Sequence, residues 1–172
     1  MSGTREGKYR VVLTAEQIER RVQELARQIS LDFRGQAIHA VCVLENGFVF
    51  MADLMRELDG EVFCHFIRPD FNEVGSTTQI FYSPEPLVHG VDVLLVETVV
   101  ETGVTSEFLM RNVLARGATT VKLVTLLDRQ AARRVQLQPD YFGFLIDEPF
   151  VFGYGLGAPH RGRNLPFLAT ET

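Results

Sequence analysis

The segment from Glu97 to Thr105 carries the residue types that can bind a phosphate group. It reads ETVVETGVT, follows an apolar run and leads into a predicted helix. Backbone amides at a helix N-terminus point outward, and the helix dipole favours negative charge there. Thr102 and Thr105 add two hydroxyls beside Gly103. The spacing fits an ordinary strand-to-helix turn capped by Thr105 equally well, and it matches neither the Walker nor the GxGxxG pattern.

The apolar pattern around this segment predicts alternating strands and helices. Short, continuous apolar runs are typical of parallel strands covered on both faces, and Thr14 with Gln17 predicts a capping box at the start of a helix that Gly35 ends. The succession of strand, helix and strand predicts an α/β fold with a mostly parallel sheet. Strands are predicted over 37–44, 61–67, 79–82, 91–97, 121–127, 140–146 and 150–154, helices over 14–33, 48–58 and 105–115, and loops over 70–78 and 98–104.

These elements decide where a ligand is expected. In parallel α/β sheets, ligands bind at the carboxyl ends of the strands, near a topological switch point. The loops after Leu44, Ile67, Glu97 and Leu127 are therefore the first candidates for a binding site. The end of the chain is expected to be irregular.

Composition limits the class of protein. The chain has 172 residues, of which 46% are hydrophobic and 23% charged, as in a single soluble domain with its own core. Its net charge of −5 argues against binding to nucleic acid but allows a small phosphorylated ligand. No apolar run is long enough for a membrane span, and the polar start shows no secretory signal. We therefore expect a cytoplasmic protein without nucleic-acid or membrane partners.

Several other polar residues have simpler interpretations. Cys42 and Cys64 lie in apolar runs and are read as buried free thiols. No Cys/His cluster indicates a zinc site, and Ser106 has no evident triad partners. His39 and His65 are read as structural residues, Arg133 and Arg134 as solvated surface, and His160 as either a ligand contact or a solvated loop residue.

Motifs along most of the chain resemble one family. VLLVETVVETGVT resembles the phosphoribosyl pyrophosphate signature of type I phosphoribosyltransferases, and further motifs resemble the hypoxanthine-guanine members of that family in order and spacing. The likeness implies a mostly parallel twisted sheet flanked by helices, in one domain over 1–172, with a core over about 34–130 and a small hood over about 1–13 and 140–172. The further motifs are FVFMADLMREL, TLLDR with its following Arg-Arg, DYFGF, FVFGYGL and RNLP.

The resemblance implies a role for each matching position. The implied reaction is attack of a purine nitrogen on the anomeric carbon of phosphoribosyl pyrophosphate, with pyrophosphate leaving and Mg²⁺ as cofactor. Glu97 would be the only metal contact, through water or the ribose. The implied residues are Glu101 for catalysis at purine N7; Thr102, Gly103, Val104 and Thr105 for the 5′-phosphate; Glu97 and Thr98 for the ribose; Val99, Arg129, Phe150 and Val151 for the purine; Leu44, Glu45, Asn46, Gly47 and Arg163 for the pyrophosphate; and Asp70 and Phe71 as a cover.

The same comparison of motifs shows where this sequence departs from the family. Two positions that usually hold aspartate have lost their carboxylates, which weakens the expected magnesium site. The pyrophosphate turn carries an acid where the family has a base. The departures are Thr98 and Gly157 for aspartate, Glu45 for a basic residue, Asn46 for glycine, Asp70-Phe71 for Ser-Tyr, Glu101 for aspartate and Arg129 for lysine.

Three functions are compatible with this pattern. The first is a purine phosphoribosyltransferase of the salvage type that makes a nucleoside monophosphate. The second is a catalytically weak or silent relative that binds purine nucleotides as a sensor or regulatory subunit. A third is regulation by RNA binding, which the net charge disfavours. By resemblance, we expect a homodimer or homotetramer.

Overall fold

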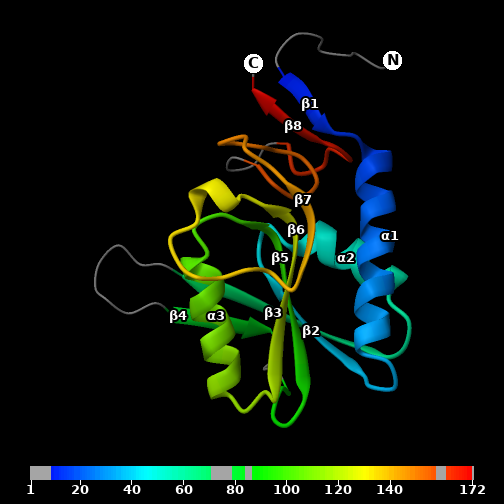
Figure 1. Ribbon diagram of the computed structural model, residues 1–172, viewed down its shortest axis with the longest axis vertical. Helices are drawn as coiled ribbons and strands as arrows, with labels where there is room; N and C mark the ends of the chain where they lie inside the picture. The colour runs from blue at the N-terminus through cyan, green and yellow to red at the C-terminus, as the bar shows by residue number, and fades with distance from the viewer. Residues whose placement is uncertain (1–8, 71–78, 84–86, 158–161, 172) are drawn as a thin grey trace.

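A six-stranded sheet forms the centre of the molecule (Figure 1). The computed structural model describes residues 9–70, 79–83, 87–157 and 162–171. The strand order is β4-β3-β2-β5-β6-β7, and only β4 is antiparallel to its neighbour. The strands are β2 (Ile38–Val43), β3 (Val62–Asp70), β4 (Gln79–Ser83), β5 (Asp92–Val100), β6 (Thr120–Asp128) and β7 (Tyr141–Leu145). The predicted α/β fold with a mostly parallel sheet is confirmed.

Helices cover both faces of this sheet (Figure 1). On one face, α1 (Ala15–Asp32) and α2 (Phe48–Glu57) enclose the larger apolar cluster. On the other face, α3 (Val104–Ala115) covers β5 and β6 and encloses the smaller cluster. The predicted capping box is confirmed, because the Gln17 amide donates to Thr14 Oγ1 and the Thr14 amide donates to Gln17 Oε1. Within the described ranges, no helix is both long and apolar enough to cross a membrane.

The strand before the phosphate-loop candidate is longer than predicted. The interpretation of residues 98–104 as a loop is wrong for its first part, because β5 continues to Val100. Val99 and Val100 stay in register with Leu127 and Asp128 of β6, and Val100 is buried. The turn between β5 and α3 therefore consists only of residues 101–103.

The two ends of the chain pair with each other. A two-stranded antiparallel sheet joins β1 (Tyr9–Leu13) to β8 (Leu168–Glu171), neither of which was predicted. The predicted strand over 150–154 is wrong; that segment makes two isolated bridges, from Phe152 to Ala169 and from Gly153 to Leu156. β7 lies at the edge of the main sheet, next to β6.

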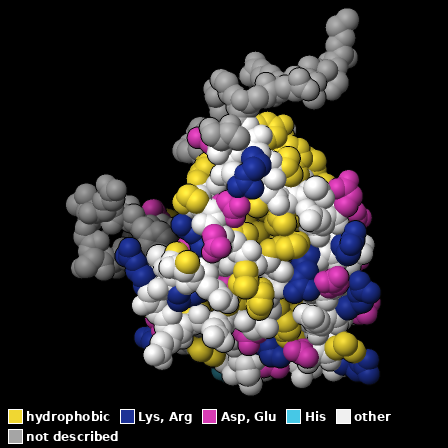
Figure 2. All heavy atoms as spheres, turned by 45° about the horizontal axis from the view of Figure 1, so that its top comes forward, with side chains coloured by type: hydrophobic (Ala, Val, Ile, Leu, Met, Phe, Trp, Pro, Cys, Tyr) yellow, Lys and Arg dark blue, Asp and Glu magenta, His cyan; other side chains and the backbone are white. Residues whose placement is uncertain are grey.

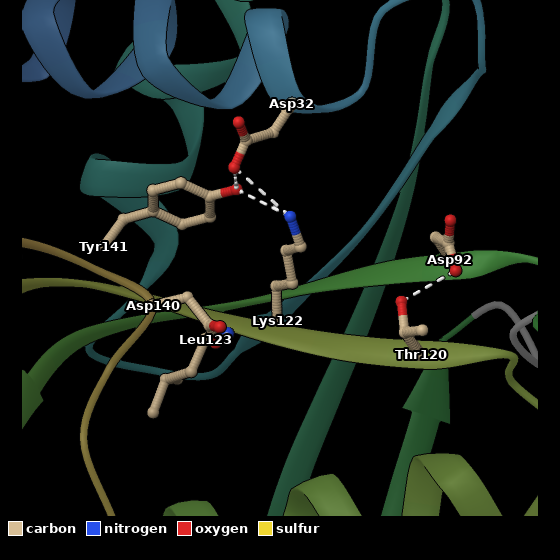
Figure 3. Close-up of polar contacts among 7 residues, drawn as sticks. All are labelled: Asp32, Asp92, Thr120, Lys122, Leu123, Asp140 and Tyr141. Atoms are coloured by element: carbon tan, nitrogen blue, oxygen red, sulfur yellow. Dashed lines mark hydrogen bonds and ion pairs between the residues drawn. The ribbon is translucent and has the colours of Figure 1, made fainter.

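A polar network fastens α1 to the amino ends of the strands (Figure 3). The Tyr141 hydroxyl donates to Asp32 Oδ2 at 2.6 Å, and Lys122 Nζ lies 3.2 Å from the same oxygen. Burial, followed by the Asp32 carboxylate, raises the pKa of Tyr141. The Leu123 amide donates to Asp140 on the same edge. This network lies opposite the carboxyl ends of the strands, so its role is to hold the scaffold together.

Candidate active site

A cavity of about 300 Å³ opens at the carboxyl ends of the central strands. The chain reverses its direction of winding here, because β2 has β3 on one side and β5 on the other. This is the switch point at which parallel sheets leave room for a ligand. The cavity brings together three loops that are distant in sequence, and its lining consists of Val43, Leu44, Asn46, Pro69, Glu97, Thr98, Val99, Glu101, Thr102, Gly103, Thr105 and Ser106.

The turn between β5 and α3 presents free backbone donors to this cavity. Gly103 adopts a left-handed conformation, with φ of 78°, and α3 begins directly after it. The first helical hydrogen bond runs from the Glu107 amide to the Gly103 carbonyl at 2.9 Å. The amides of Thr105 and Ser106 therefore precede the helical ladder and have no intrahelical acceptor. The Val104 amide donates to Thr102 Oγ1 at 3.3 Å within the turn. The Thr105 and Ser106 amides lie outside the helical ladder, so the turn retains the geometry of an anion-binding nest.

The segment that follows β6 packs against this turn and fixes its shape. A Cβ at Gly103 would lie 2.9 Å from Val135 Cγ2 and 3.0 Å from Arg133 Cδ, so only glycine fits without movement. The Arg134 amide also donates to the Thr102 carbonyl at 2.9 Å. The interpretation of Arg133 as solvated surface is wrong: its side chain is only 13% exposed, and it forms an ion pair with the buried Asp128. Arg134 is exposed.

Glu97 is a buried carboxyl group at the base of the cavity. Burial raises its pKa to about 7, while a hydrogen bond with Ser106 and the positive charge of Arg133 act in the opposite direction. Its Oε1 atom has no hydrogen-bond partner among the described residues. Such a buried acceptor suits a hydroxyl group of a ligand, as the implied ribose role requires.

The side chains of the cavity do not form a protein-built magnesium site. Mg²⁺ prefers carboxylate oxygens, but the described part of the chain holds no group of three His, Cys, Asp or Glu side chains placed for a metal. Thr98 donates its hydroxyl hydrogen to the Asn46 carbonyl at 2.8 Å, which leaves it able only to accept from a ribose hydroxyl. Glu97 is the one buried carboxyl group in the lining.

Glu101 and Arg129 meet at the side of the cavity where the purine is expected. Arg129 Nη1 lies 2.9 Å from Glu101 Oε1, and the same nitrogen donates to the Pro149 carbonyl at 3.3 Å. Phe150, the next residue, is 43% exposed and so has ring surface available for stacking. Val151 packs against the larger apolar cluster. The structure therefore brings the implied catalytic acid close to two of the implied purine residues.

The expected pyrophosphate side is built around Asn46. Arg163 Nη1 donates to Asn46 Oδ1 at 2.7 Å and to the Gly155 carbonyl at 2.6 Å. Gly47 is the N-cap of α2 and packs closely against the end of β2. A Cβ at this position would lie 2.6 Å from the Val43 carbonyl oxygen. Glu45 is exposed beside this turn.

Other predicted residues have simpler places. Asp70 ends β3 in register with Gln79, whereas Phe71 and His160 lie outside the described residues. His39 and His65 stack on each other with ring centroids 6.0 Å apart, away from the cavity lining, and burial lowers both pKa values. Both cysteines are free, and burial raises the pKa of Cys42 to about 12.

Sequence reasoning missed four residues at the site: Val43, Pro69 and Ser106, which line the cavity, and Arg133, whose charge acts on Glu97. Ser106 was considered only as a nucleophile, but it supports Glu97. Its position in the first turn of α3, directly after the phosphate loop, is the signal that indicates this role. A larger groove of about 720 Å³ lies between α1, α2 and the C-terminal segment, but it contains none of the phosphate-loop residues.

Comparison with known proteins agrees with this arrangement. Residues 9–159 match the model of the phosphoribosyl transferase domain. The hypoxanthine-guanine phosphoribosyltransferase of Bacillus subtilis is 31% identical over 92% of this chain and 91% of its own length. The bifunctional protein TilS/HprT of Listeria monocytogenes is 33% identical over 92% of this chain, which spans only 25% of that relative. The crystal structure of a hypoxanthine-guanine phosphoribosyltransferase from Bacillus anthracis superposes with a TM-score of 0.89 at 34% identity, covering 95% of this chain and 96% of that one.

Proposed function

This chain belongs to the phosphoribosyl transferase domain family, and on that premise we propose that it is a purine phosphoribosyltransferase of the hypoxanthine-guanine type. It transfers 5-phosphoribose from phosphoribosyl pyrophosphate to a purine base. The products are a nucleoside monophosphate and pyrophosphate. The observation that carries this proposal is the pair of first-turn amides of Thr105 and Ser106, which precede the helical hydrogen bonds and share a cavity with the unpartnered Glu97 carboxyl oxygen.

The proposal gives each side of the cavity one part of the reaction. The nest over residues 102–105 holds the 5′-phosphate, and Glu97 with Thr98 accepts hydrogen bonds from the ribose hydroxyls. Arg129 and Phe150 orient the purine. Glu101 accepts the proton from purine N7 while the other nitrogen of the five-membered ring attacks the anomeric carbon, and the pair of electrons in the broken bond leaves with pyrophosphate.

Magnesium belongs to this proposal as a companion of the substrate. The family uses Mg²⁺, and its chemistry is to neutralise the phosphates of the donor. Glu97 is the one buried carboxyl group of the lining, so it would hold the ion, through water or the ribose, together with the phosphates of phosphoribosyl pyrophosphate.

A transfer assay tests the proposal. Purified protein is incubated with phosphoribosyl pyrophosphate, Mg²⁺ and one of hypoxanthine, guanine, xanthine or adenine. Release of pyrophosphate with hypoxanthine or guanine, matched by the nucleoside monophosphate, is the expected result. Release no faster than in the blank with every base would overturn the proposal.

The second candidate is a relative that binds purine nucleotides with little or no transfer. It is favoured by the acidic Glu45 in the pyrophosphate turn, by Gly157 and by the Thr98 hydroxyl that is donated to Asn46. Calorimetry with GMP and IMP separates the two candidates. Tight binding of a nucleotide without turnover supports the second, whereas no binding at millimolar ligand removes it.

The remaining partners follow from the same family membership. We propose a homodimer or homotetramer in the cytoplasm, with a purine base, phosphoribosyl pyrophosphate or a purine nucleotide as its ligands. On the face drawn in Figure 2, basic and acidic side chains are interspersed. The predicted lack of nucleic-acid partners is in keeping with that mixture and with the net charge of −5.

A further inference from the structure

Asn46 is a side chain of the cavity whose chemistry the resemblance does not supply, because the family has glycine there. It lies in the loop between β2 and α2, is exposed and lines the same cavity as Thr102, Gly103 and Thr105. Two hydrogen bonds fix it. Its carbonyl oxygen accepts from Thr98 Oγ1 at 2.8 Å, and its Oδ1 accepts from Arg163 Nη1 at 2.7 Å.

The bond to Arg163 settles the orientation of the amide group. A guanidinium has donors only, so the atom that faces it must be the amide oxygen and the other atom must be the nitrogen. Arg163 is held in turn by the Gly155 carbonyl at 2.6 Å. The Asn46 Nδ2 group carries two donors, and it has no protein partner in the parts of the chain that the structure describes.

The surroundings of Asn46 call for such a donor. Pyrophosphate is strongly anionic, yet Glu45 adds negative charge to this turn and Gly157 supplies no carboxylate for a metal. The described residues contain no protein-built metal cluster that could compensate. A neutral amide donates to a phosphate oxygen without requiring a metal ion, and a hydrogen bond to a charged group is stronger than one between neutral groups.

We propose that the side-chain amide of Asn46, oriented by Arg163, donates a hydrogen bond to the leaving pyrophosphate group of phosphoribosyl pyrophosphate. This inference rests on the proposed function. It makes Asn46 a determinant of the affinity of this chain for phosphoribosyl pyrophosphate. The side-chain amide would then serve in place of a carboxylate that is missing from this chain. It also gives the Thr98 hydroxyl a second role beside the proposed ribose contact, because Thr98 donates to the main chain of Asn46 and holds it in place.

The test compares two ligands that both carry a 5′-phosphate for the nest, phosphoribosyl pyrophosphate and GMP. Only the first also carries a pyrophosphate group. Calorimetry measures binding of phosphoribosyl pyrophosphate and of GMP to the wild type, to Asn46→Ala and to Asn46→Asp, each with Mg²⁺ and with a chelator. Asn164→Ala is the matched control, because Asn164 is an exposed amide next to Arg163 but outside the cavity.

We expect Asn46→Ala to weaken phosphoribosyl pyrophosphate about tenfold or more in both buffers, as the loss of one charge-assisted hydrogen bond requires. GMP, which has no pyrophosphate, should keep its affinity within about twofold. Asn46→Asp retains an acceptor for Arg163 but loses the donor, so it should bind phosphoribosyl pyrophosphate no better than Asn46→Ala. Asn164→Ala should behave as the wild type.

Three results would overturn the inference. Wild-type affinity in Asn46→Ala would show that the amide does not touch the ligand. Wild-type affinity in Asn46→Asp would show that Asn46 only tethers Arg163, and a parallel loss of GMP would indicate a general structural role. A wild-type protein that binds GMP but not phosphoribosyl pyrophosphate would also overturn it, whereas failure to bind either ligand would refute the proposed function itself.

Discussion

Glu101 and Arg129 are the charged pair on which the proposed chemistry depends at the scale of single residues. Their ion pair of 2.9 Å holds the carboxylate beside the expected purine, although half of its surface remains exposed. We expect Glu101→Ala to lower kcat about 100-fold or more, because a positioned general base contributes on that order. Steady-state kinetics with hypoxanthine or guanine measures this. Glu107→Ala, which removes an exposed ion pair with Arg111 on α3, is the control and should leave kcat unchanged.

Glu97 links the site to a pH-dependent stability. Its pKa is raised from 4.5 to about 7 in the folded protein, so the folded state binds more protons than the unfolded chain between these values. Stability therefore falls as the pH rises from about 4.5 to 7, by up to about 3 kcal/mol. Glu97→Gln has no ionisable group at this position, so its stability should not show this fall with rising pH. Urea unfolding of both proteins at pH 5 and pH 8 measures the difference, and parallel changes in the two would contradict the account.

Residue types left the phosphate loop and an ordinary strand-to-helix turn equally open, and the family resemblance implied the roles of Glu97 and Arg129. The structure brings these residues to one end of the sheet. The resemblance implied a pyrophosphate role for Asn46, but its bonds to Thr98 and Arg163 could not be predicted because both partners are distant in sequence. The burial of Arg133 could not be predicted either. Arg133 looked like solvated surface until its ion pair with Asp128 was seen.

At the scale of elements, the turn from β5 to α3 depends on glycine at position 103. Its φ of 78° and the close approach of Val135 both oppose a side chain. Gly103→Ala should therefore weaken GMP binding at least tenfold and destabilise the fold by about 2 kcal/mol. Gly35→Ala is the matched control, because Gly35 has a φ of 81° but open space around it. It should cost only about 1 kcal/mol and leave GMP affinity unchanged; equal effects of the two variants on GMP binding would contradict this role.

The elements that bury one or two apolar faces could be predicted from sequence. β2, α2, β6 and α3 lie within one or two residues of their predicted bounds. The extension of β5 was missed because Thr98 interrupts the apolar run, and only pairing with β6 keeps the following residues in the strand. β1 and β8 were missed because β1 is mostly exposed and each strand exists only through its distant partner.

At the scale of the whole molecule, the order of the strands explains why these residues meet. The switch between β2 and β5 places the loop with Asn46 next to the loop with Gly103, although 57 residues separate them in sequence. The C-terminal segment then adds Arg163, and the Tyr154 hydroxyl ties it to Asp53 of α2 at 2.6 Å. The polar network at the opposite edge leaves the carboxyl ends free for the ligand.

The most direct test of the account compares GMP with guanosine, which lacks only the phosphate. The central claim is that the amides and hydroxyls over residues 102–105 capture the 5′-phosphate of a purine nucleotide. Calorimetry on the wild-type protein should show GMP binding at least about 100-fold more tightly than guanosine, since a charged group meets several donors at a helix N-terminus. Equal affinity for the two ligands, or no binding of GMP at millimolar concentration, would contradict the claim.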